Sequence, residues 1–252
     1  MEDAARRKFD LLAQAAVPVM EGLDGLVKLL IAQLAEIDRR HPGWKDREDD
    51  TLPEWSGQDA RRFFFLTLRS TIMNALLSNI FFRDHLCSQD WWVDHHWTGT
   101  HPENQAEEYA RSIRWLTFQQ ATMIMESTVR AIIRSEDTGI FSVPPAEVSR
   151  AGYYKLHKNL LEVLGLTEFQ ALFAVASETR NTIHNNGMYA PPDGKDKTYD
   201  YEGKTFDFEV GAGLPWFTDS VALWLIEAMA TAMRQVVLAP QVSSIPFCAR
   251  RP

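Results

Sequence analysis

Apolar residues recur at three- and four-residue steps along the first forty residues of the chain, which is the period of an amphipathic α-helix. Pro18 interrupts this stretch, because proline lacks the backbone N–H that an interior helical turn needs. His41-Pro42-Gly43 ends it. The pattern predicts one kinked helix or two helices over residues 3–39. The apolar positions that carry the period are Leu23, Val27, Leu30, Leu34 and Ile37.

Two further helices are predicted before residue 140, each from a start signal followed by apolar spacing. Ser56-Gly57-Gln58-Asp59 resembles a capping box and precedes a helix that continues to about Ile80. Thr100-His101-Pro102-Glu103 places proline in the first turn, so a long helix is expected from about 102 to 136. The tryptophan-rich residues 90–97 between these helices show no helical period.

The next two helices are bounded by glycine signals. Gly165 stops a helix that is expected over 153–164. Thr167 starts another, and Asn185-Asn186-Gly187 supplies the left-handed cap that ends it. The chain is therefore expected to leave the second helix at about residue 185.

One hairpin and one closing helix complete the pattern. Residues 199–208 alternate aromatic and polar side chains around a glycine turn, which favours a short β-hairpin. A last apolar helix is expected over 215–238, and Pro240 ends it. The fold class is thus predicted to be all-α, a helical bundle with one small β-hairpin.

The net charge and the small number of cysteines exclude several classes of protein. The 252 residues carry 26 Lys and Arg against 34 Asp and Glu, a net charge of −8, so no global attraction to nucleic acid or anionic lipid is expected. Only Cys87 and Cys248 occur, which fits a reducing compartment and excludes a disulfide framework or a thiolate zinc site. The charged first residues resemble no export signal, and no apolar run reaches the roughly 20 residues of a membrane span. We expect a cytoplasmic protein without membrane contact.

The residues that suggest chemistry gather at the end of the helix that starts at Thr167. Projected at roughly 100° per residue, Arg180 lies on the apolar stripe of this helix, where a guanidinium needs a partner. His184 falls about 40° away on the same side, with Ser177 near it and Asn181 at its flank. A permanent cation beside an imidazole suits phosphoryl chemistry, because one holds a phosphate while the other moves a proton.

A carboxylate partner for Arg180 is available in the helix expected over 102–136. Glu126 and Arg130 share one face there at i,i+4, and Glu126 pairs with Arg180 if the two helices pack antiparallel. The alternative interpretation is structural, because Arg and His in the last turns of a helix interact well with its negative end. The Asn-Asn-Gly run is then only a stop signal. The residues alone leave both interpretations open.

The order of these features from residue 102 to about 240 resembles the HEPN domain family. The resemblance rests on Arg180-Asn181 followed by His184 at the end of the penultimate helix, then Asn-Asn-Gly, an irregular loop, an aromatic hairpin and a closing helix. It implies a HEPN-like helical bundle over 91–240, an N-terminal helical extension over 1–90 packed on it, and a C-terminal tail over 241–252. The spacing from Arg to His is shorter here than is usual in the family.

Active members of that family are metal-independent ribonucleases, often homodimers in which the two motifs face each other. Carried over by the resemblance, His184 handles the proton of an attacking ribose 2′-hydroxyl and Arg180 stabilises charge on the adjacent phosphate. Asn181 orients both, and Glu126 belongs to the same catalytic set. No cofactor is expected. The partners implied are RNA, a second copy of the chain and a cognate antitoxin, within a toxin or defence system.

Residues around the motif extend it into an expected substrate-binding surface. Ser177 and Asn185 flank the motif, and Lys155, His157 and Lys158 add positive charge on the preceding helix. A solvated helix face explains the lysines equally well. The rival hypothesis is a non-catalytic helical interaction protein, or a nucleotide- or RNA-binding protein, of the same fold, with the motif as a buried hydrogen-bonded support.

Two other features have both a functional and a structural interpretation. An acidic and His-rich stretch over 90–101 suggests metal ligands, but its spacing matches no strong metal-site template, and a packed tryptophan-rich loop is favoured. Side chains of the hairpin, Tyr201 and Phe208, have the rings to stack on bases, although a small hairpin needs such pairs for its own stability. We expect a structural role for both features. The ligand candidates are Asp90, Asp94, His95, His96 and His101.

Overall fold

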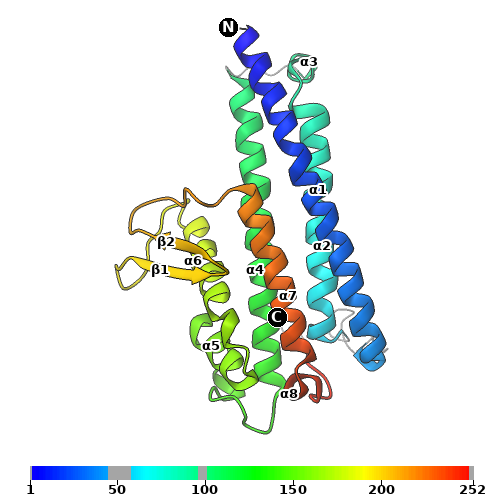
Figure 1. Ribbon diagram of the computed structural model, residues 1–252, viewed down its shortest axis with the longest axis vertical. Helices are drawn as coiled ribbons and strands as arrows, with labels where there is room; N and C mark the ends of the chain where they lie inside the picture. Colours follow the sequence, from blue (N-terminus) through cyan, green and yellow to red (C-terminus); the bar gives the residue numbers. More distant parts are fainter. Residues whose placement is uncertain (1, 45–57, 96–100, 250–252) are drawn as a thin grey trace.

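The computed structural model describes residues 2–44, 58–95 and 101–249, and most of them are helical (Figure 1). Eight α-helices and one two-stranded antiparallel sheet form in this part of the chain, which confirms the all-α fold class with a small hairpin. The elements are α1 (Glu2–Arg40), α2 (Ala60–Phe81), α3 (Gln89–Asp94), α4 (Pro102–Ser135), α5 (Tyr153–Leu164), α6 (Gln170–His184), β1 (Lys197–Tyr201), β2 (Lys204–Phe208), α7 (Asp219–Leu238) and α8 (Pro240–Ser243).

Helix α1 runs without a break through Pro18, so the alternative of two helices is wrong. Proline removes one hydrogen bond to the carbonyl four residues earlier, which belongs to Gln14. Both residues are exposed, so this carbonyl lies on the water side of the helix, where the loss is tolerated. The other face of α1 carries the buried stripe that the apolar period predicted.

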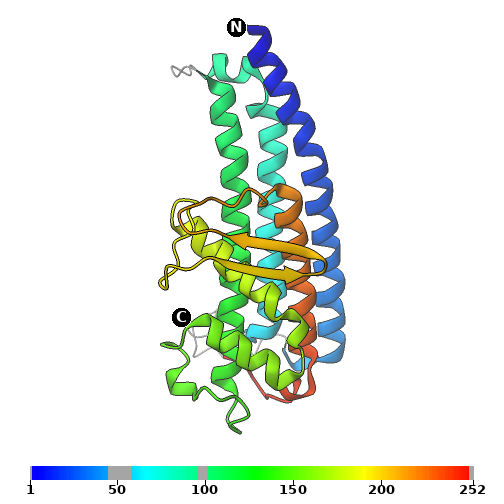
Figure 2. The same ribbon diagram turned by 60° about the vertical axis from the view of Figure 1, so that its left-hand side comes forward.

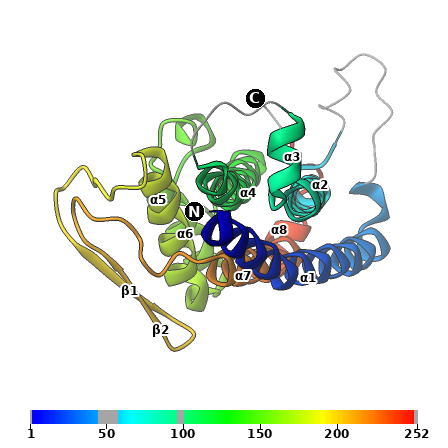
Figure 3. The ribbon, with the colours of Figure 1, turned by 90° about the horizontal axis from the view of Figure 1, so that it is seen from above.

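Helix α4 is the central element of the molecule. It packs against α2 on one side and against α5 and α6 on the other (Figure 1). Helix α1 lies along α2, and α7 lies along α1 and α4 but begins only about halfway up the bundle. Figure 2 shows the hairpin and α6 in front of these long helices. Seen from above, in Figure 3, the hairpin extends to one side of the bundle.

One hydrophobic core runs through these elements. Leu30 of α1 and Phe65 of α2 are fully buried in the same cluster as Met125, Phe173 and Met229 of the later helices. Residues that the sequence assigned to an N-terminal extension therefore share their core with residues of the expected bundle. The division of the chain at residue 90 stays a prediction.

A smaller apolar cluster closes the end of the bundle where α1 starts. Here the stretch expected as a packed loop from residue 90 is helical as far as Asp94, because the short helix α3 follows a π-helical turn, Phe82–Leu86. The 6 residues of α3 are too few to display a helical period. Trp92 is buried in this cluster, and its indole N–H donates to the Leu86 carbonyl over 3.0 Å.

The segment after α7, expected as a tail from residue 241, is tied to the start of α2. Asp59 caps α2 and forms an ion pair with Arg61, with 2.6 Å between Oδ2 and Nη2 and both side chains fully buried. Arg61 also donates to the backbone carbonyls of Val242 and Ile245, and the N–H of Cys248 donates to Asp59. Residues 242–248 are thus held in place by the core. Ser56 and Gly57 of the expected capping box lie outside the described residues.

The hairpin is a structural cover for α6 and α7. Strands β1 and β2 pair antiparallel, with Tyr199 opposite Phe206. Tyr201 and Phe206 pack against Trp224 of α7, with ring centroids 5.6 and 6.1 Å away, and Phe208 is fully buried. The structural role expected for Tyr201 and Phe208 is confirmed.

Two helices of the described residues, Ala60–Leu86 and α7, are long and apolar enough to cross a membrane, judged by length and composition alone. Both also supply buried side chains to the core, and core helices of other proteins have the same composition. The absence of membrane contact stays a prediction.

Candidate active site on helix α6

Helix α6 ends where the sequence places the motif. Its buried residues, Leu172–Ala176, anchor it in the core. After His184 the chain turns away, because Asn186 and Gly187 adopt left-handed backbone angles, with φ of 57° and 82°. The N–H of Gly187 donates to the Thr182 carbonyl over 2.9 Å. The expected Asn-Asn-Gly stop is confirmed, and it leaves the last turn of α6 at the surface.

Arg180 is held by the carboxylate that the sequence proposed as its partner. Its Nη1 donates to Glu126 Oε2, and its Nη2 donates to Asn181 Oδ1 over 3.1 Å. Because Glu126 meets Arg180 while Gln119 meets His184, α4 and α6 run antiparallel. The predicted pair is thereby confirmed. The side chains of Arg180 and Glu126 are only 20% and 17% exposed.

Glu126 is shared with a second guanidinium. Arg130 donates to Glu126 Oε1 from Nε over 3.0 Å and from Nη2 over 2.7 Å. Its Nη1 donates to the carbonyls of Val148 and Ala151, in the turn before α5. One carboxylate thus faces two guanidinium groups, which leaves the trio with one excess positive charge. Arg180 has fewer partners than Arg130, and its Nε is buried without a hydrogen bond.

His184 lies one turn beyond Arg180 and is exposed. Its Nε2 is 2.9 Å from the side-chain amide nitrogen of Gln119. The amide N–H donates, so Nε2 carries the lone pair and the proton of the neutral ring is on Nδ1. An exposed imidazole with an acceptor nitrogen is able to take a proton from a bound hydroxyl.

The other expected substrate-binding residues spread over two helices. Ser177 is half-buried before the motif, and Asn185 is exposed just after it. Lys155 and Lys158 are exposed on α5, where Lys158 lies 3.9 Å from Glu162. Within the described ranges, no hydrogen bond or ion pair joins either lysine to Arg180 or His184.

His157 is not the positive charge that the sequence suggested. It is fully buried beside Tyr153 and Phe173, with ring centroids 5.0 and 5.6 Å away. Burial lowers the pKa of His157 to about 4, so the ring is neutral at pH 7. The interpretation failed because this position belongs to the apolar stripe of α5. That stripe consists of Tyr153, Leu156, His157, Leu160 and Leu161.

The described residues hold no group of three or more His, Cys, Asp or Glu side chains placed to bind a metal ion. In the stretch considered for metal, the ring of His95 stacks on Trp91 with centroids 4.2 Å apart. Nδ1 of His101 lies 3.1 Å from a carboxylate oxygen of Glu103. The short helix α3 and its tryptophans agree with the packed interpretation that was favoured, whereas His96 lies outside the described residues.

Gln119 is the candidate residue that the sequence analysis missed. It lies seven residues before Glu126, which is two helical turns, so both side chains point from α4 toward α6. An antiparallel α6 then brings Arg180 to one of them and His184 to the other. The seven-residue spacing between Gln119 and Glu126 is the sequence signal that could have identified Gln119.

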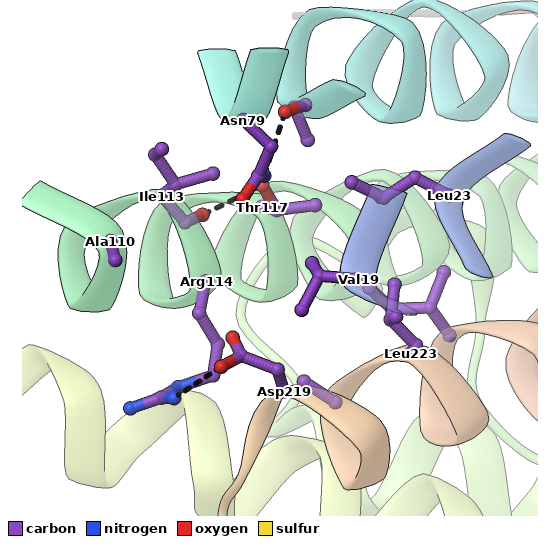
Figure 4. Close-up of a pocket in the computed structure, with 12 residues that line it drawn as sticks. Val19, Leu23, Asn79, Ala110, Ile113, Arg114, Thr117, Asp219 and Leu223 are labelled. Carbon is purple, nitrogen blue, oxygen red and sulfur yellow. Dashed lines mark hydrogen bonds and ion pairs between the residues drawn. The ribbon is translucent and has the colours of Figure 1, made fainter. Parts of the chain in front are cut away.

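A narrow pocket elsewhere in the bundle shares no lining residue with the motif. It lies between α1, α2, α4 and α7, among apolar side chains that include Val19 and Leu223 (Figure 4). At one end Arg114 donates to Asp219 over 3.1 Å. The two charged side chains that line it are therefore paired with each other.

The candidate site thus consists of Arg180, Asn181 and His184 on α6, backed by Gln119 and Glu126 on α4. Its geometry can bind an anion at the guanidinium and move a proton at the imidazole. The chain matches no protein-family model, no curated protein and no solved structure.

Proposed function

We propose that the protein is a HEPN-like endoribonuclease that works without a metal ion, with Arg180 and His184 as its catalytic pair. The observation that carries the proposal is the placement of a partly exposed guanidinium and an exposed imidazole one turn apart at the end of α6. The resemblance of the Arg-Asn-x-x-His motif supports the same activity, and helical spacing keeps both side chains on one side of the helix.

The charge around Arg180 suits a phosphate ligand. Glu126 and Asn181 fix the guanidinium, and the trio with Arg130 retains one excess positive charge. This excess positive charge attracts a phosphate oxygen to Arg180, whose side chain is 20% exposed. In this proposal Glu126 is a positioning residue, because it reaches the substrate only through Arg180.

The proposed reaction uses the ribose 2′-hydroxyl as the nucleophile. His184 Nε2 leaves Gln119 and takes the hydroxyl proton, and the 2′-oxygen forms a bond to the adjacent phosphorus. The bond from phosphorus to the 5′-oxygen breaks, and that oxygen receives a proton. The products are a 2′,3′-cyclic phosphate and a 5′-hydroxyl. Arg180 stabilises the negative charge that develops on the phosphorane oxygens.

A second copy of the chain completes the proposed site. The attacking hydroxyl loses a proton while the leaving oxygen gains one, so two proton carriers are needed, and a homodimer with facing motifs supplies two imidazoles. Leu116 and Met123 flank Gln119 on α4 and are 57% and 52% exposed, which gives this face an apolar contact surface. A cognate antitoxin stays a prediction of the resemblance.

Cleavage of RNA in the presence of EDTA tests the proposal. Wild-type protein is expected to produce fragments that end in 2′,3′-cyclic phosphate, and RNA with 2′-deoxyribose at the cleaved position should resist. His184→Ala should lower the rate by at least about a hundredfold, because it removes the general base. His85→Ala, at an exposed histidine of the π-helical turn, is the matched control and should keep the wild-type rate. Intact RNA across varied substrates, or full activity of folded His184→Ala, would contradict the proposal.

The contacts of Arg180 also favour a second function. Both of its terminal nitrogens already have protein acceptors, Glu126 and Asn181, as a purely structural arginine would. The rival is a non-catalytic interaction or RNA-binding protein. In that case RNA binds without being cleaved, and Arg180→Ala lowers the melting temperature without changing the affinity for RNA.

A further inference from the structure

A surface pocket of about 340 Å³ lies between α5, the start of α6 and β1. Helix α5 contributes Tyr154 and Lys158, one turn apart on the same face, and β1 contributes Tyr199. The start of α6 adds the carboxylate of Glu168 and the amide of Gln170. Tyr154 is 59% exposed, which is unusual for a large aromatic side chain. Two aromatic rings, a cation and two hydrogen-bonding groups thus surround one opening.

His157 lines the same pocket and is fully buried. Neither of its ring nitrogens has a hydrogen-bond partner. The ring of Tyr154 meets it edge-on, with centroids 5.3 Å apart, while Phe173 packs at 5.6 Å. Burial of a polar ring without hydrogen bonds is unfavourable, so packing alone would be served better by an apolar residue. Because His157 also lines the pocket, a ligand bound there is able to supply the missing partner.

The start of α6 gives the pocket a positive end. The helix is preceded by a 3-10 turn, Thr167–Phe169, and neither start has a side-chain cap. At this start the N–H groups of Phe169 and Gln170 donate to the carbonyls of Leu166 and Thr167, so it is the helix dipole that favours an anion here. Lys158 lines the same space from α5. Lys158 therefore offers a cation to an anionic group, in a lining that also contains the Glu168 carboxylate.

We infer that this pocket binds a nucleoside monophosphate unit, either as a free nucleotide or as one unstacked nucleotide of single-stranded RNA. The base stacks on Tyr154 and Tyr199, because every base offers a π-face to an aromatic ring. The edge of the base bonds to His157 and Gln170, and the phosphate lies beside Lys158 at the start of α6. A nucleotide combines in one small unit the three features that the pocket receives: a flat ring, a polar edge and an anion.

This inference goes beyond the proposed cleavage, because the pocket contains no residue of the motif and binds whether or not RNA is cut. The two sites are nevertheless neighbours on α6. Ala174 lines the pocket and Asn181 lies seven residues further on the same face, about 10 Å along the helix axis. A strand of RNA spans that length, so a base held in the pocket would set which phosphate reaches Arg180.

Calorimetric titration of the full chain with AMP, GMP, CMP and UMP, in EDTA, tests the inference. At least one nucleotide should bind with one-to-one stoichiometry, about tenfold or more tighter than ribose 5-phosphate or inorganic phosphate. Tyr154→Ala should weaken binding about tenfold by removing the stacking surface, whereas Tyr154→Phe should retain it. His157→Phe keeps the ring packing, removes both nitrogens and should reduce the preference among the four bases. Lys158→Ala removes the cation beside the phosphate and should weaken binding, whereas Lys28→Ala, on the exposed face of α1, is its control and should not.

Three results would overturn the inference: no binding of any of the four nucleotides, equal binding of phosphate alone, or unchanged affinity in folded Tyr154→Ala. A single-stranded trinucleotide distinguishes the two sources of the ligand. Affinity more than tenfold above that of the free nucleotide identifies RNA, and equal affinity identifies the free nucleotide. His184→Ala should bind nucleotide as the wild type does, so failure of cleavage and failure of this pocket are separate observations.

Discussion

The buried imidazole of His157 links the stability of the fold to pH. In the folded protein, burial lowers its pKa from 6.5 to about 4, and the nearby Glu126 carboxylate opposes this shift only in part. In the unfolded chain the ring regains its ordinary pKa. Between these two values the unfolded state binds a proton that the folded state does not, so acid favours unfolding there.

The free energy of unfolding should therefore be insensitive to this group above pH 6.5 and fall as the pH drops from 6.5 toward 4. The loss from this one group is about 3 kcal/mol once both states are protonated. Urea unfolding at a series of pH values measures it. His157→Phe should flatten the profile over this range, and an unchanged slope in that variant would show that other groups cause it.

At the candidate site, the sequence predicted one ion pair correctly but not which other side chains lie near the motif or are buried. The Glu126–Arg180 pair followed from one helical face and one assumption about packing direction. Gln119 did not, because its contact depends on how far α4 and α6 are shifted along each other. The interpretation of His157 as a surface charge followed its exposed neighbours Lys155 and Lys158, although helical spacing already places it on the apolar stripe of α5.

Among the elements, those with a glycine stop were predicted most accurately. Helix α5 has the expected bounds because Gly165 takes a left-handed φ of 70° and ends it. The length of α7 was overestimated, since its helix starts at Asp219 after the Thr218 cap rather than at 215. The short α3 escaped prediction, and the period left open whether α1 continues through Pro18, because both depend on tertiary contacts and solvent exposure rather than on period.

The stop at the end of α6 depends on one glycine. A Cβ on Gly187 would lie 2.9 Å from the Trp115 ring of α4, and its φ of 82° is unfavourable for any other residue. Gly187→Ala should destabilise the protein by about 2 kcal/mol.

Thermal unfolding beside Gly25→Ala, a second glycine-to-alanine change, tests this expectation. Gly25 lies inside α1 with open space around it, so alanine there should stabilise by about 0.5–1 kcal/mol. Equal melting temperatures of the two variants would contradict the assigned role of Gly187.

At the scale of the whole molecule, the chain closes on itself through Arg61. This fully buried guanidinium pairs with Asp59, donates to the carbonyls of Val242 and Ile245, and lies 3.8 Å above the ring of Trp44. It therefore joins the ends of α1 and α7 to the start of α2. Among the described residues after α8, the backbone pairs with α2 only through one isolated β-bridge, between Asp59 and Ala249. The contacts of Arg61 therefore do most to hold these residues against the core.

Removing the charge of Arg61 should lower the free energy of unfolding far more than removing the charge of Arg62. Arg61→Met leaves the buried Asp59 carboxylate without a counter-charge and should destabilise by about 3–5 kcal/mol. Arg62→Met removes a pair with Asp38 whose side chains are 16% and 19% exposed, and should cost about 1 kcal/mol. Denaturant unfolding of the two variants compares them directly. A similar loss in both would mean that the Arg61 pair does not close the fold.

The sharing of Glu126 between two arginines decides how easily the site can release one of them. If Arg180 swings toward a phosphate, the carboxylate keeps Arg130 as its counter-ion, with both donors of that contact unchanged. A partly buried acid with a single basic partner would lose its counter-ion in the same movement, at a cost of about 1 kcal/mol. In this protein Arg180 is able to exchange Glu126 for a phosphate, because Arg130 still neutralises the Glu126 carboxylate.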